Sequence, residues 1–317
     1  MALIQRVPVA PALNLMGRRN QFLAFSAFLV LAALAVFAVQ GLNLGVDFRG
    51  GILIEIRTDG PADLADLRRR LGRLGLGEVT LQEFGVETDV LINVRRQEGD
   101  EKAQIAAIET VKQELGATVV EYRRTEFVGP KVGGELKRAG ALATGLALLG
   151  IGVYIWFRFE WQYALAALVA LVHDVIATIG FFALIQLEFN LATLAAVLTI
   201  AGYSINDTVV IFDRVRETLR KYKKLPMFEL LDMSINRTLS RTLLTSLTTL
   251  LALFALFLFG GEVIRGFSVG LIWGVVIGTY SSIGLAVPLL SFMNLRGALV
   301  EPEGEETEGG KATQKAT

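Results

Sequence analysis

The sequence predicts an α-helical polytopic membrane protein with six transmembrane helices and a small α+β, ferredoxin-like domain outside the membrane. Of its 317 residues, 53% are hydrophobic and only 20% are charged, a balance that is typical of membrane proteins. Six apolar runs approach the roughly 20 residues that a helix needs to cross the hydrocarbon core. The segment between the first two runs, residues 41–137, instead carries the patterns of a water-soluble domain.

The predicted spans follow from the apolar runs in chain order. After an N-terminal segment, 1–20, the predicted transmembrane helices cover residues 21–40, 138–157, 164–185, 190–212, 241–259 and 266–292. The first run follows Arg18 and Arg19 and resembles a signal peptide. Its apolar core is longer than the roughly 7 to 15 residues of such peptides, so we interpret it as a retained anchor.

Orientation is predicted from the short loops, because cytoplasmic loops carry an excess of Lys and Arg. The loop 213–240 is the richest in cations, and its basic residues are Arg214, Arg216, Arg220, Lys221, Lys223, Lys224 and Arg237. We therefore place this loop and both termini in the cytoplasm, and residues 41–137 in the periplasm. The tail, 293–317, is charged and has no apolar periodicity, so it is predicted to be disordered.

The periplasmic segment has the pattern of a βαββαβ fold. Strands are predicted at 52–56, 79–84, 90–94 and 118–122, and helices at 62–74 and 102–115. This order is the ferredoxin-like arrangement. The segment contains no His and no catalytic constellation. We therefore interpret it as a packing or protein-contact module, and we expect the chain not to be an enzyme.

A glycine-containing junction links the first span to this domain. It includes Asp47 and Arg49, followed by the pair Gly50 and Gly51. Adjacent glycines allow backbone conformations that other residues avoid, so a tight turn is predicted here. A structural turn and a contact site both remain open.

Asp207, beside Asn206, is the first candidate functional residue, because it lies inside the fourth apolar run. An ionisable side chain at the centre of a membrane helix costs at least about 2.5 to 3.5 kcal/mol, so it usually faces a partner, a cavity or an ion path. Arg241 enters the fifth span from the same side, at a similar depth. The hypothesis is a proton site in which Arg241 acts on Asp207. The alternatives are a structural carboxylate at Asp207 and an ordinary interfacial anchor at Arg241.

His173 and Asp174 lie near the centre of the third span. As neighbours on a helix they are expected to point in different directions, and a proton relay and a packing hydrogen bond both remain open. One His, no Cys and scattered carboxylates do not supply a metal site, so no metal or cofactor is expected. Basic and acidic residues are equal at 31 each, so the net charge gives no indication of nucleic-acid binding.

The sixth span carries glycines four residues apart. They are Gly266, Gly270, Gly274 and Gly278. Such a ladder makes a smooth helix face that allows close approach of another helix. Tight packing within the chain is one interpretation, and sliding against or contact with a partner subunit is the other.

Three longer motifs carry a family resemblance. They are GVDFRGG at 45–51, GYSINDTVVIFDRVRE at 202–217 and SINRTLSRTLLTSLTTLLAL at 234–253. Together with the six-span layout they resemble the SecF branch of the bacterial SecD/SecF protein-export family, within the RND superfamily.

The resemblance implies a function, a location and partners. It implies that the chain works with SecD beside the SecYEG channel in the inner membrane, after SecA has driven a polypeptide inward. H⁺ is then the coupling ion, the proton-motive force helps to pull the translocating polypeptide out, and Asp207 and Arg241 match the family's proton-pathway residues. The resemblance also names YajC and YidC as further partners, and it assigns the outer domain to substrate handling or to contacts with SecD.

Two other functions are compatible with this sequence. Half of an RND-type exporter of lipids or small molecules has the same fold, but the outer domain here leaves little room for a substrate pocket. A passive scaffold that stabilises SecD or the channel makes Asp207 a structural residue.

Overall fold

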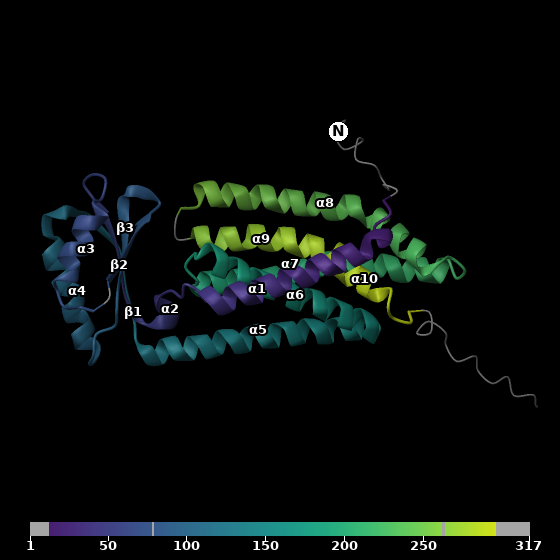
Figure 1. The fold of residues 1–317 in the computed structure, drawn as a ribbon, viewed down its shortest axis with the longest axis horizontal. Helices are drawn as coiled ribbons and strands as arrows, with labels where there is room; N and C mark the ends of the chain where they lie inside the picture. The colour runs from purple at the N-terminus through teal and green to yellow at the C-terminus, as the bar shows by residue number, and fades with distance from the viewer. Residues whose placement is uncertain (1–12, 78, 262–263, 296–317) are drawn as a thin grey trace, which may run out of the picture.

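The computed structural model describes residues 13–77, 79–261 and 264–295. The protein is elongated, with a small sheet domain at one end and a helical bundle along the rest of its length (Figure 1). The predicted fold class is confirmed, because the described residues contain six helices long and apolar enough to cross a membrane.

The bundle is made of long helices joined by short connections. They are α1 (Arg19–Gln40, after a 3₁₀ turn at Met16–Arg18), α5 (Pro130–Arg158), α6 (Trp161–Ile185), α7 (Leu191–Lys221), α8 (Met227–Phe259) and α9 (Arg265–Ser281). The last span continues through a π-helical turn, Ser282–Ala286, into α10 (Val287–Leu290). The first helix begins and the last ends at the bundle end opposite the sheet domain (Figure 1).

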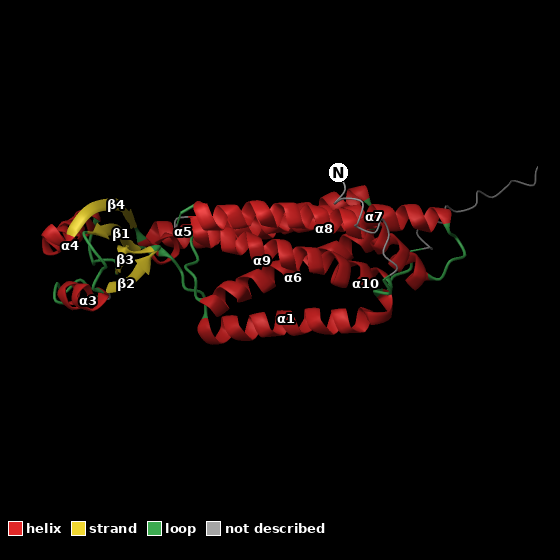
Figure 2. Ribbon diagram, turned by 90° about the horizontal axis from the view of Figure 1, so that it is seen from above, coloured by secondary structure: helices red, strands yellow, loops and turns green. Residues whose placement is uncertain are grey.

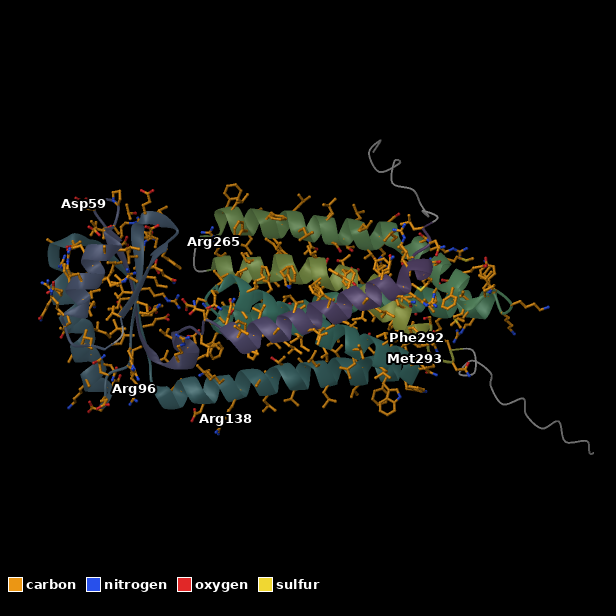
Figure 3. All side chains as sticks on the ribbon, in the orientation of Figure 1. Asp59, Arg96, Arg138, Arg265, Phe292 and Met293 are labelled. Atoms are coloured by element: carbon orange, nitrogen blue, oxygen red, sulfur yellow. The ribbon has the colours of Figure 1, made fainter. Side chains whose placement is uncertain are left out.

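The helices form an inner and an outer set. α6, α7 and α9 bury about half of their apolar windows within the chain, whereas α1, α5 and α8 bury far less. The exposed sides of the outer helices carry large apolar side chains such as Phe28, Leu146 and Leu251. The middle of the bundle therefore presents mainly hydrocarbon, while polar atoms gather at its two ends and on the sheet domain (Figure 3).

The basic segment 213–240 contains more helix than the predicted spans suggest. α7 continues to Lys221 and α8 begins at Met227, so only the short stretch 222–226 connects them. The extensions are stabilised by their own apolar core, because Phe212, Val215 and Leu230 are fully buried. A run of cations marks the membrane boundary but does not end a helix, since Arg and Lys are good helix formers.

The sheet domain has the predicted ferredoxin-like order. Its elements are β1 (Gly51–Thr58), α3 (Leu64–Gly72), β2 (Val79–Phe84), β3 (Val86–Val94), α4 (Glu101–Leu115) and β4 (Val119–Val128). The strands pair antiparallel in the order β2-β3-β1-β4, and Ile54 of β1 lies opposite Ile92 and Thr125. Because alternate residues of a strand face opposite sides, β1 directs Ile52, Ile54 and Ile56 into the core under α3 and α4.

The other face of the sheet is directed toward the bundle (Figures 1 and 2). It carries two buried carboxylates, Glu55 and Asp89. Arg57 binds Asp89 through two nitrogens, at 2.8 and 3.1 Å, and Arg123 reaches both Asp89, at 2.7 Å, and Glu55, at 3.6 Å. The hydrogen bond from Arg57, together with the charge of Arg123, holds the pKa of Asp89 below its usual value despite the opposing effect of burial.

Candidate functional site

Asp207 lies on the inner side of α7, in the part of the helix that faces α8 and α9. α7 starts at a capping box, in which the Asn190 side chain accepts from the Thr193 amide and the Thr193 hydroxyl accepts from the Asn190 amide. Asp207 is only 4% exposed. Its Oδ2 atom is buried and has no hydrogen-bond partner among the described residues. A buried carboxylate with an unpartnered oxygen calls for a proton, a water or a partner group.

Arg241 does not form an ion pair with Asp207. Within the described residues no nitrogen of Arg241 comes within 4.0 Å of the carboxylate, although the two charges attract at longer range. Arg241 lies on the outward face of α8, while Asp207 faces inward. On α8, the hydrogen-bonding neighbour of the Asp207 carboxylate is Ser246. Ser246 also bonds Thr279 of α9, at 2.7 Å.

Asn206, next to Asp207, is exposed on the outside of the bundle. It continues an exposed row on α7 that consists of Ala195, Thr199, Gly202 and Asn206. α8 carries a shorter row, made of Thr248, Ala252 and Ala255, with Arg241 two turns before it and the exposed Leu244 and Leu251 beside it. We call these two rows the small-residue face.

The two rows lie side by side. Thr249 of α8 contacts Tyr203 of α7, and Ser246 of α8 contacts Thr279 of α9. With 100° between successive helical residues, each row borders the α7–α8 contact on the side away from α9. The outward side of α7 also lacks large apolar residues, since Leu191 is the one such side chain that α7 exposes among its described residues. The small-residue face is therefore suited to another helix rather than to lipid.

His173 and Asp174 form a hydrogen-bonded pair, which corrects the expectation that they point apart. Nδ1 of His173 lies 2.9 Å from Oδ1 of Asp174, and both residues are buried. Although their Cα–Cβ bonds differ by 100° around the helix, their rotamers bring the side chains together. Oδ2 of Asp174 accepts from Ser204 of α7 at 2.6 Å and from Ser281 of α9 at 2.7 Å.

Sequence reasoning missed Thr279, Tyr280 and Ser281, three residues at the end of α9 that complete these contacts. The run Thr279, Tyr280, Ser281 and Ser282 lies within an otherwise apolar span, and each of its hydroxyl groups bonds a different helix. Four consecutive polar residues in a membrane span are the signal that was available for finding them.

The glycine ladder lies at a contact within the chain. A Cβ atom added to Gly274 would lie 2.1 Å from Ile200 of α7, and one added to Gly278 would lie 2.9 Å from Ser204. Added Cβ atoms at Gly266 and Gly270 would also meet α7, at 3.1 Å from Thr193 and 3.3 Å from Ala196. The ladder therefore brings the α7 and α9 backbones close together.

The junction binds the start of α7 to the sheet domain. Asp47 lies in the short helix α2 (Val46–Arg49) and accepts a hydrogen bond from the Leu191 amide at 2.9 Å. Phe48 is buried and stacks on Phe189, with 5.9 Å between ring centroids. Gly50 and Gly51 have φ values of 72° and 139°, so the predicted turn depends on backbone angles that favour glycine.

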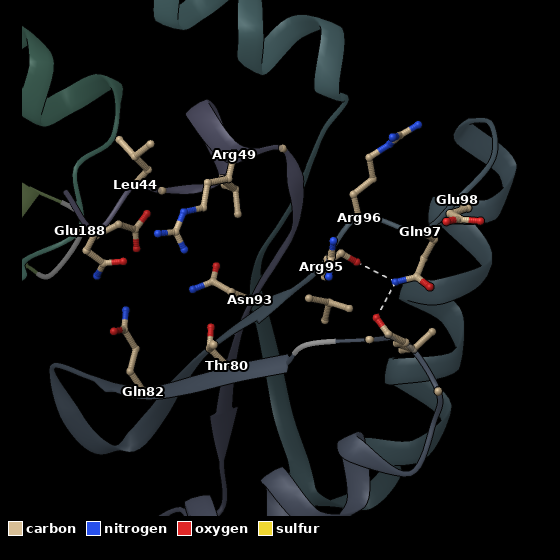
Figure 4. Close-up of a pocket in the computed structure, with 18 residues that line it drawn as sticks. Leu44, Arg49, Thr80, Gln82, Asn93, Arg95, Arg96, Gln97, Glu98 and Glu188 are labelled. Atoms are coloured by element: carbon tan, nitrogen blue, oxygen red, sulfur yellow. Dashed lines mark hydrogen bonds between the residues drawn. The ribbon is translucent and has the colours of Figure 1, made fainter. Parts of the chain in front are cut away.

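Arg49 lines a polar cleft of about 960 Å³ between this junction and the sheet. Its side chain extends between Asn93 of β3 and Glu188 of the α6–α7 loop (Figure 4). Burial and, next, the charge of Asp47 raise the pKa of Glu188, and Arg124 opposes this effect. The described residues contain no group of three or more His, Asp or Glu able to hold a metal ion.

Comparison with known proteins places the chain in a family. A family model described as "Protein export membrane protein SecD/SecF, C-terminal" matches residues 107–296, and one described as "SecD/SecF GG Motif" matches 35–62. The chain is 50% identical over 274 residues to the protein translocase subunit SecF of Rickettsia rickettsii, covering 85% of this chain and 88% of that protein. It is 46% identical over 288 residues to that of Rickettsia prowazekii, covering 90% and 92%. The chain belongs to the SecF family.

Solved SecDF structures share the fold of this SecF-family chain. The crystal structure of SecDF from Thermus, described as a translocon-associated membrane protein, matches with a TM-score of 0.81 and 35% identity, over 90% of this chain. SecDF in its super-membrane-facing form matches with a TM-score of 0.66 at the same identity. The SecF-family chain spans 39% and 40% of these longer SecDF chains.

Proposed function

We propose that this chain is the SecF subunit of the bacterial protein-export machinery. In this proposal it works with SecD and uses the proton-motive force to assist late, ATP-independent steps of polypeptide translocation. It has no enzymatic role and no cofactor, and H⁺ is the coupling ion. The names of its relatives, protein translocase subunit SecF, support this proposal.

The observation that carries the proposal is the state of Asp207. Its carboxylate is buried in a membrane-spanning helix, one oxygen has no partner, and no cation lies within 4.0 Å among the described residues. An unpaired charge there is costly, so gain or loss of a proton changes the stability of the surrounding packing. One charge that crosses about 100 mV releases roughly 2.3 kcal/mol. This is enough to shift the equilibrium between two conformations whose free energies differ by a similar amount.

The small-residue face supports SecD as the partner. Its small and polar side chains flank the α7–α8 contact beside Asp207, and Arg241 stands at its edge. A partner helix packed there would cover Asn206, the neighbour of Asp207 in the sequence, and would meet Arg241. Arg241 and the partner's polar groups would then decide when the carboxylate is ionised.

The charge distribution supports a proposed location and orientation. We place the chain in the bacterial inner membrane with both termini in the cytoplasm and the sheet domain in the periplasm, because the α7–α8 connection carries the Lys and Arg excess. SecYEG, the translocating polypeptide, YajC and YidC are the further partners of this proposal.

The test is the substitution Asp207→Asn, with Asp213→Asn as its matched control. Both replace one carboxylate of α7, but Asp213 is exposed and pairs with Arg158 at 3.4 Å. Asp207→Asn should abolish the part of secretion that depends on the proton-motive force, while Asp213→Asn should retain it. The measurement is export of a reporter protein into inverted membrane vesicles, with and without a proton gradient, at matched levels of bound SecD.

Two outcomes would contradict the proposal. Normal gradient-dependent export in Asp207→Asn would favour the passive scaffold. Efflux of a fluorescent lipid or drug that depends on Asp207, without an export defect, would favour the RND-type exporter.

A further inference from the structure

The centre of the bundle contains a buried carboxylate–imidazole pair that is separate from Asp207. Asp174 is fully buried, and His173 is 3% exposed. Ser204 and Ser281 both donate to Oδ2 of Asp174, so Oδ1 is the oxygen that faces Nδ1 of His173. Three helices, α6, α7 and α9, thus meet at one carboxylate.

Within the described residues, no Lys or Arg forms an ion pair with Asp174 or His173. The basic side chain in contact with Asp174 is His173 itself, at 2.9 Å. The titratable side chains on the surrounding helices are Tyr280 on α9 and Asp207 on α7. The charged residues of α1 and α5 lie toward the ends of those helices. In hydrocarbon surroundings a net charge is costly, so the pair is most stable when it is neutral overall.

If the Asp174–His173 pair has no net charge, the positions of its two protons are defined. The neutral pair holds one proton between Oδ1 and Nδ1 and a second on Nε2 of the imidazole. When Nε2 releases its proton, the shared proton is retained on Nδ1, which leaves a carboxylate beside a neutral imidazole. One N–H bond breaks at Nε2, the net charge falls by one, and the hydrogen bond between the two residues persists.

The surroundings of the Nε2 atom of His173 suit a site of proton uptake and release. This atom is buried and has no hydrogen-bond partner among the described residues. A buried donor without a partner is unfavourable by about 1 to 3 kcal/mol, so a structural histidine would normally be satisfied at this position. We propose that Asp174 and His173 form a second proton-binding site, which takes up and releases its proton at Nε2 of His173.

The residues from Thr279 to Ser282 connect this site to the rest of the bundle. Ser281 binds Asp174, and its neighbour Thr279 bonds Ser246 of α8, which is beside Asp207. Tyr280 bonds Ser26 of α1 at 2.9 Å, and Ser282 bonds Thr208 of α7 at 2.8 Å.

A π-helical turn begins at Ser282, and such turns occur frequently at functional sites. A change in charge at Asp174 therefore acts directly on the segment that also contacts α1, α7 and α8. This inference rests on the proposed function, because it supplies a second proton site for the same coupled cycle.

The single histidine allows a direct test. His173 is the one His in the chain, so ¹⁵N-histidine labelling of the full chain in lipid vesicles gives signals from this imidazole alone. Nitrogen NMR between about pH 5 and 9, the range in which histidine sites titrate, should show Nε2 losing its proton while Nδ1 keeps one. In Asp174→Asn this step should disappear, because the amide cannot supply an acidic proton to Nδ1.

Two control variants separate this site from its surroundings. Ser281→Ala removes one donor and leaves both titrating residues, so the Nε2 step should remain. Asp207→Asn should also keep the step, even where it abolishes gradient-dependent export. Should Asp174→Asn fail to accumulate in the membrane, Asp174→Ser keeps a small hydrogen-bonding side chain and takes its place.

The same variants in the export assay give the functional result. Asp174→Asn should lower gradient-dependent export at least tenfold at a normal membrane level, with gradient-independent export unchanged. An Nε2 atom that keeps one protonation state throughout the pH range, or a step that persists unchanged in Asp174→Asn, would overturn the inference. Normal export in Asp207→Asn would instead contradict the proposed function and leave the NMR result standing.

Discussion

Asp174 and Asp207 are both buried aspartates of the membrane-spanning part, but they differ in their partners. Asp174 accepts hydrogen bonds from Ser204 and Ser281 and shares a third with Nδ1 of His173. Asp207 has an unpartnered oxygen and lies beside the small-residue face. The first carboxylate ties helices of this chain together, whereas the second is placed to respond to what packs against α7 and α8.

A third buried aspartate, Asp89, permits a pH prediction outside the membrane. Because its pKa is lowered in the folded domain, it contributes stability above its unfolded pKa of about 3.9, and this contribution is lost as the pH falls through the folded value. Amide protection in β1 and β3, measured by hydrogen exchange, should therefore decrease on acidification below about pH 4. Asp89→Asn should reduce protection at pH 7 roughly tenfold or more, since hydrogen bonds to charged groups contribute about 1.5 to 3 kcal/mol.

The control for this prediction is Asp59→Asn, at an exposed aspartate in the loop after β1. It should leave protection in β1 and β3 at its wild-type level. Equal protection in Asp89→Asn and the wild type at pH 7 would show that the Arg57–Asp89 contact does not stabilise the sheet.

At the scale of the element, α9 combines two kinds of contact along one helix. Its glycines at 266, 270, 274 and 278 allow close packing on α7. Its final turn and the following Ser282 replace close packing with side-chain hydrogen bonds to four helices. Close backbone approach keeps α7 and α9 in register, and this register places Ser204 of α7 and Ser281 of α9 where both bond Asp174 of α6.

Substitution of Gly274 tests this packing. In Gly274→Ala the new Cβ would lie 2.1 Å from Cγ1 of Ile200, so we expect a loss of about 1 to 3 kcal/mol, typical of overpacking. Gly145→Ala on α5 is the matched control, because no atom lies within 4 Å of its added Cβ. Thermal unfolding in detergent should show a lower midpoint for Gly274→Ala only.

A second substitution, at Ile200, tests the same contact between α7 and α9. Ile200→Ala removes the atoms that the new methyl would meet, so the double variant with Gly274→Ala should be more stable than the sum of the two single effects. If the stability changes of the two single variants simply add in the double variant, the helices separate freely at this point and their close approach is not needed.

At the scale of the whole molecule, α2 connects two parts that have separate cores. The sheet domain has its core under α3 and α4, while α6, α7 and α9 form the centre of the bundle. Asp47 caps α7, and Phe48 packs on Phe189. Movement of α7 is therefore transmitted to the sheet domain through a direct hydrogen bond as well as through the chain.

Asp47→Ala should loosen this connection without unfolding either part. The chain has no Cys, so single cysteines at the exposed positions Asp59 and Leu142 can carry spin labels. The distribution of distances between the labels should broaden in Asp47→Ala, because the bond to the Leu191 amide is lost. Asp63→Ala, which removes the cap of α3 inside the sheet domain, should leave it unchanged, and an unaltered distribution in Asp47→Ala would show that the bond does not hold the domain.

The sequence by itself determined the elements of this protein. Apolar length predicted the six spans, and the period-two and helical patterns predicted the βαββαβ order, because both depend on neighbours along the chain. Asp207 was also identifiable, since a carboxylate in an apolar run is conspicuous without any knowledge of its partners.

Only the tertiary structure decided which polar groups meet. Sequence spacing predicted that His173 and Asp174 diverge, but rotamers and the donors Ser204 and Ser281 join them at one site. Spacing also allowed Asp207 and Arg241 to lie at one depth, yet Asp207 is buried, Arg241 is exposed, and among the described residues no ion pair joins them. Depth along a helix is set by residue number, whereas the direction of a side chain and its partners are set by how whole helices pack.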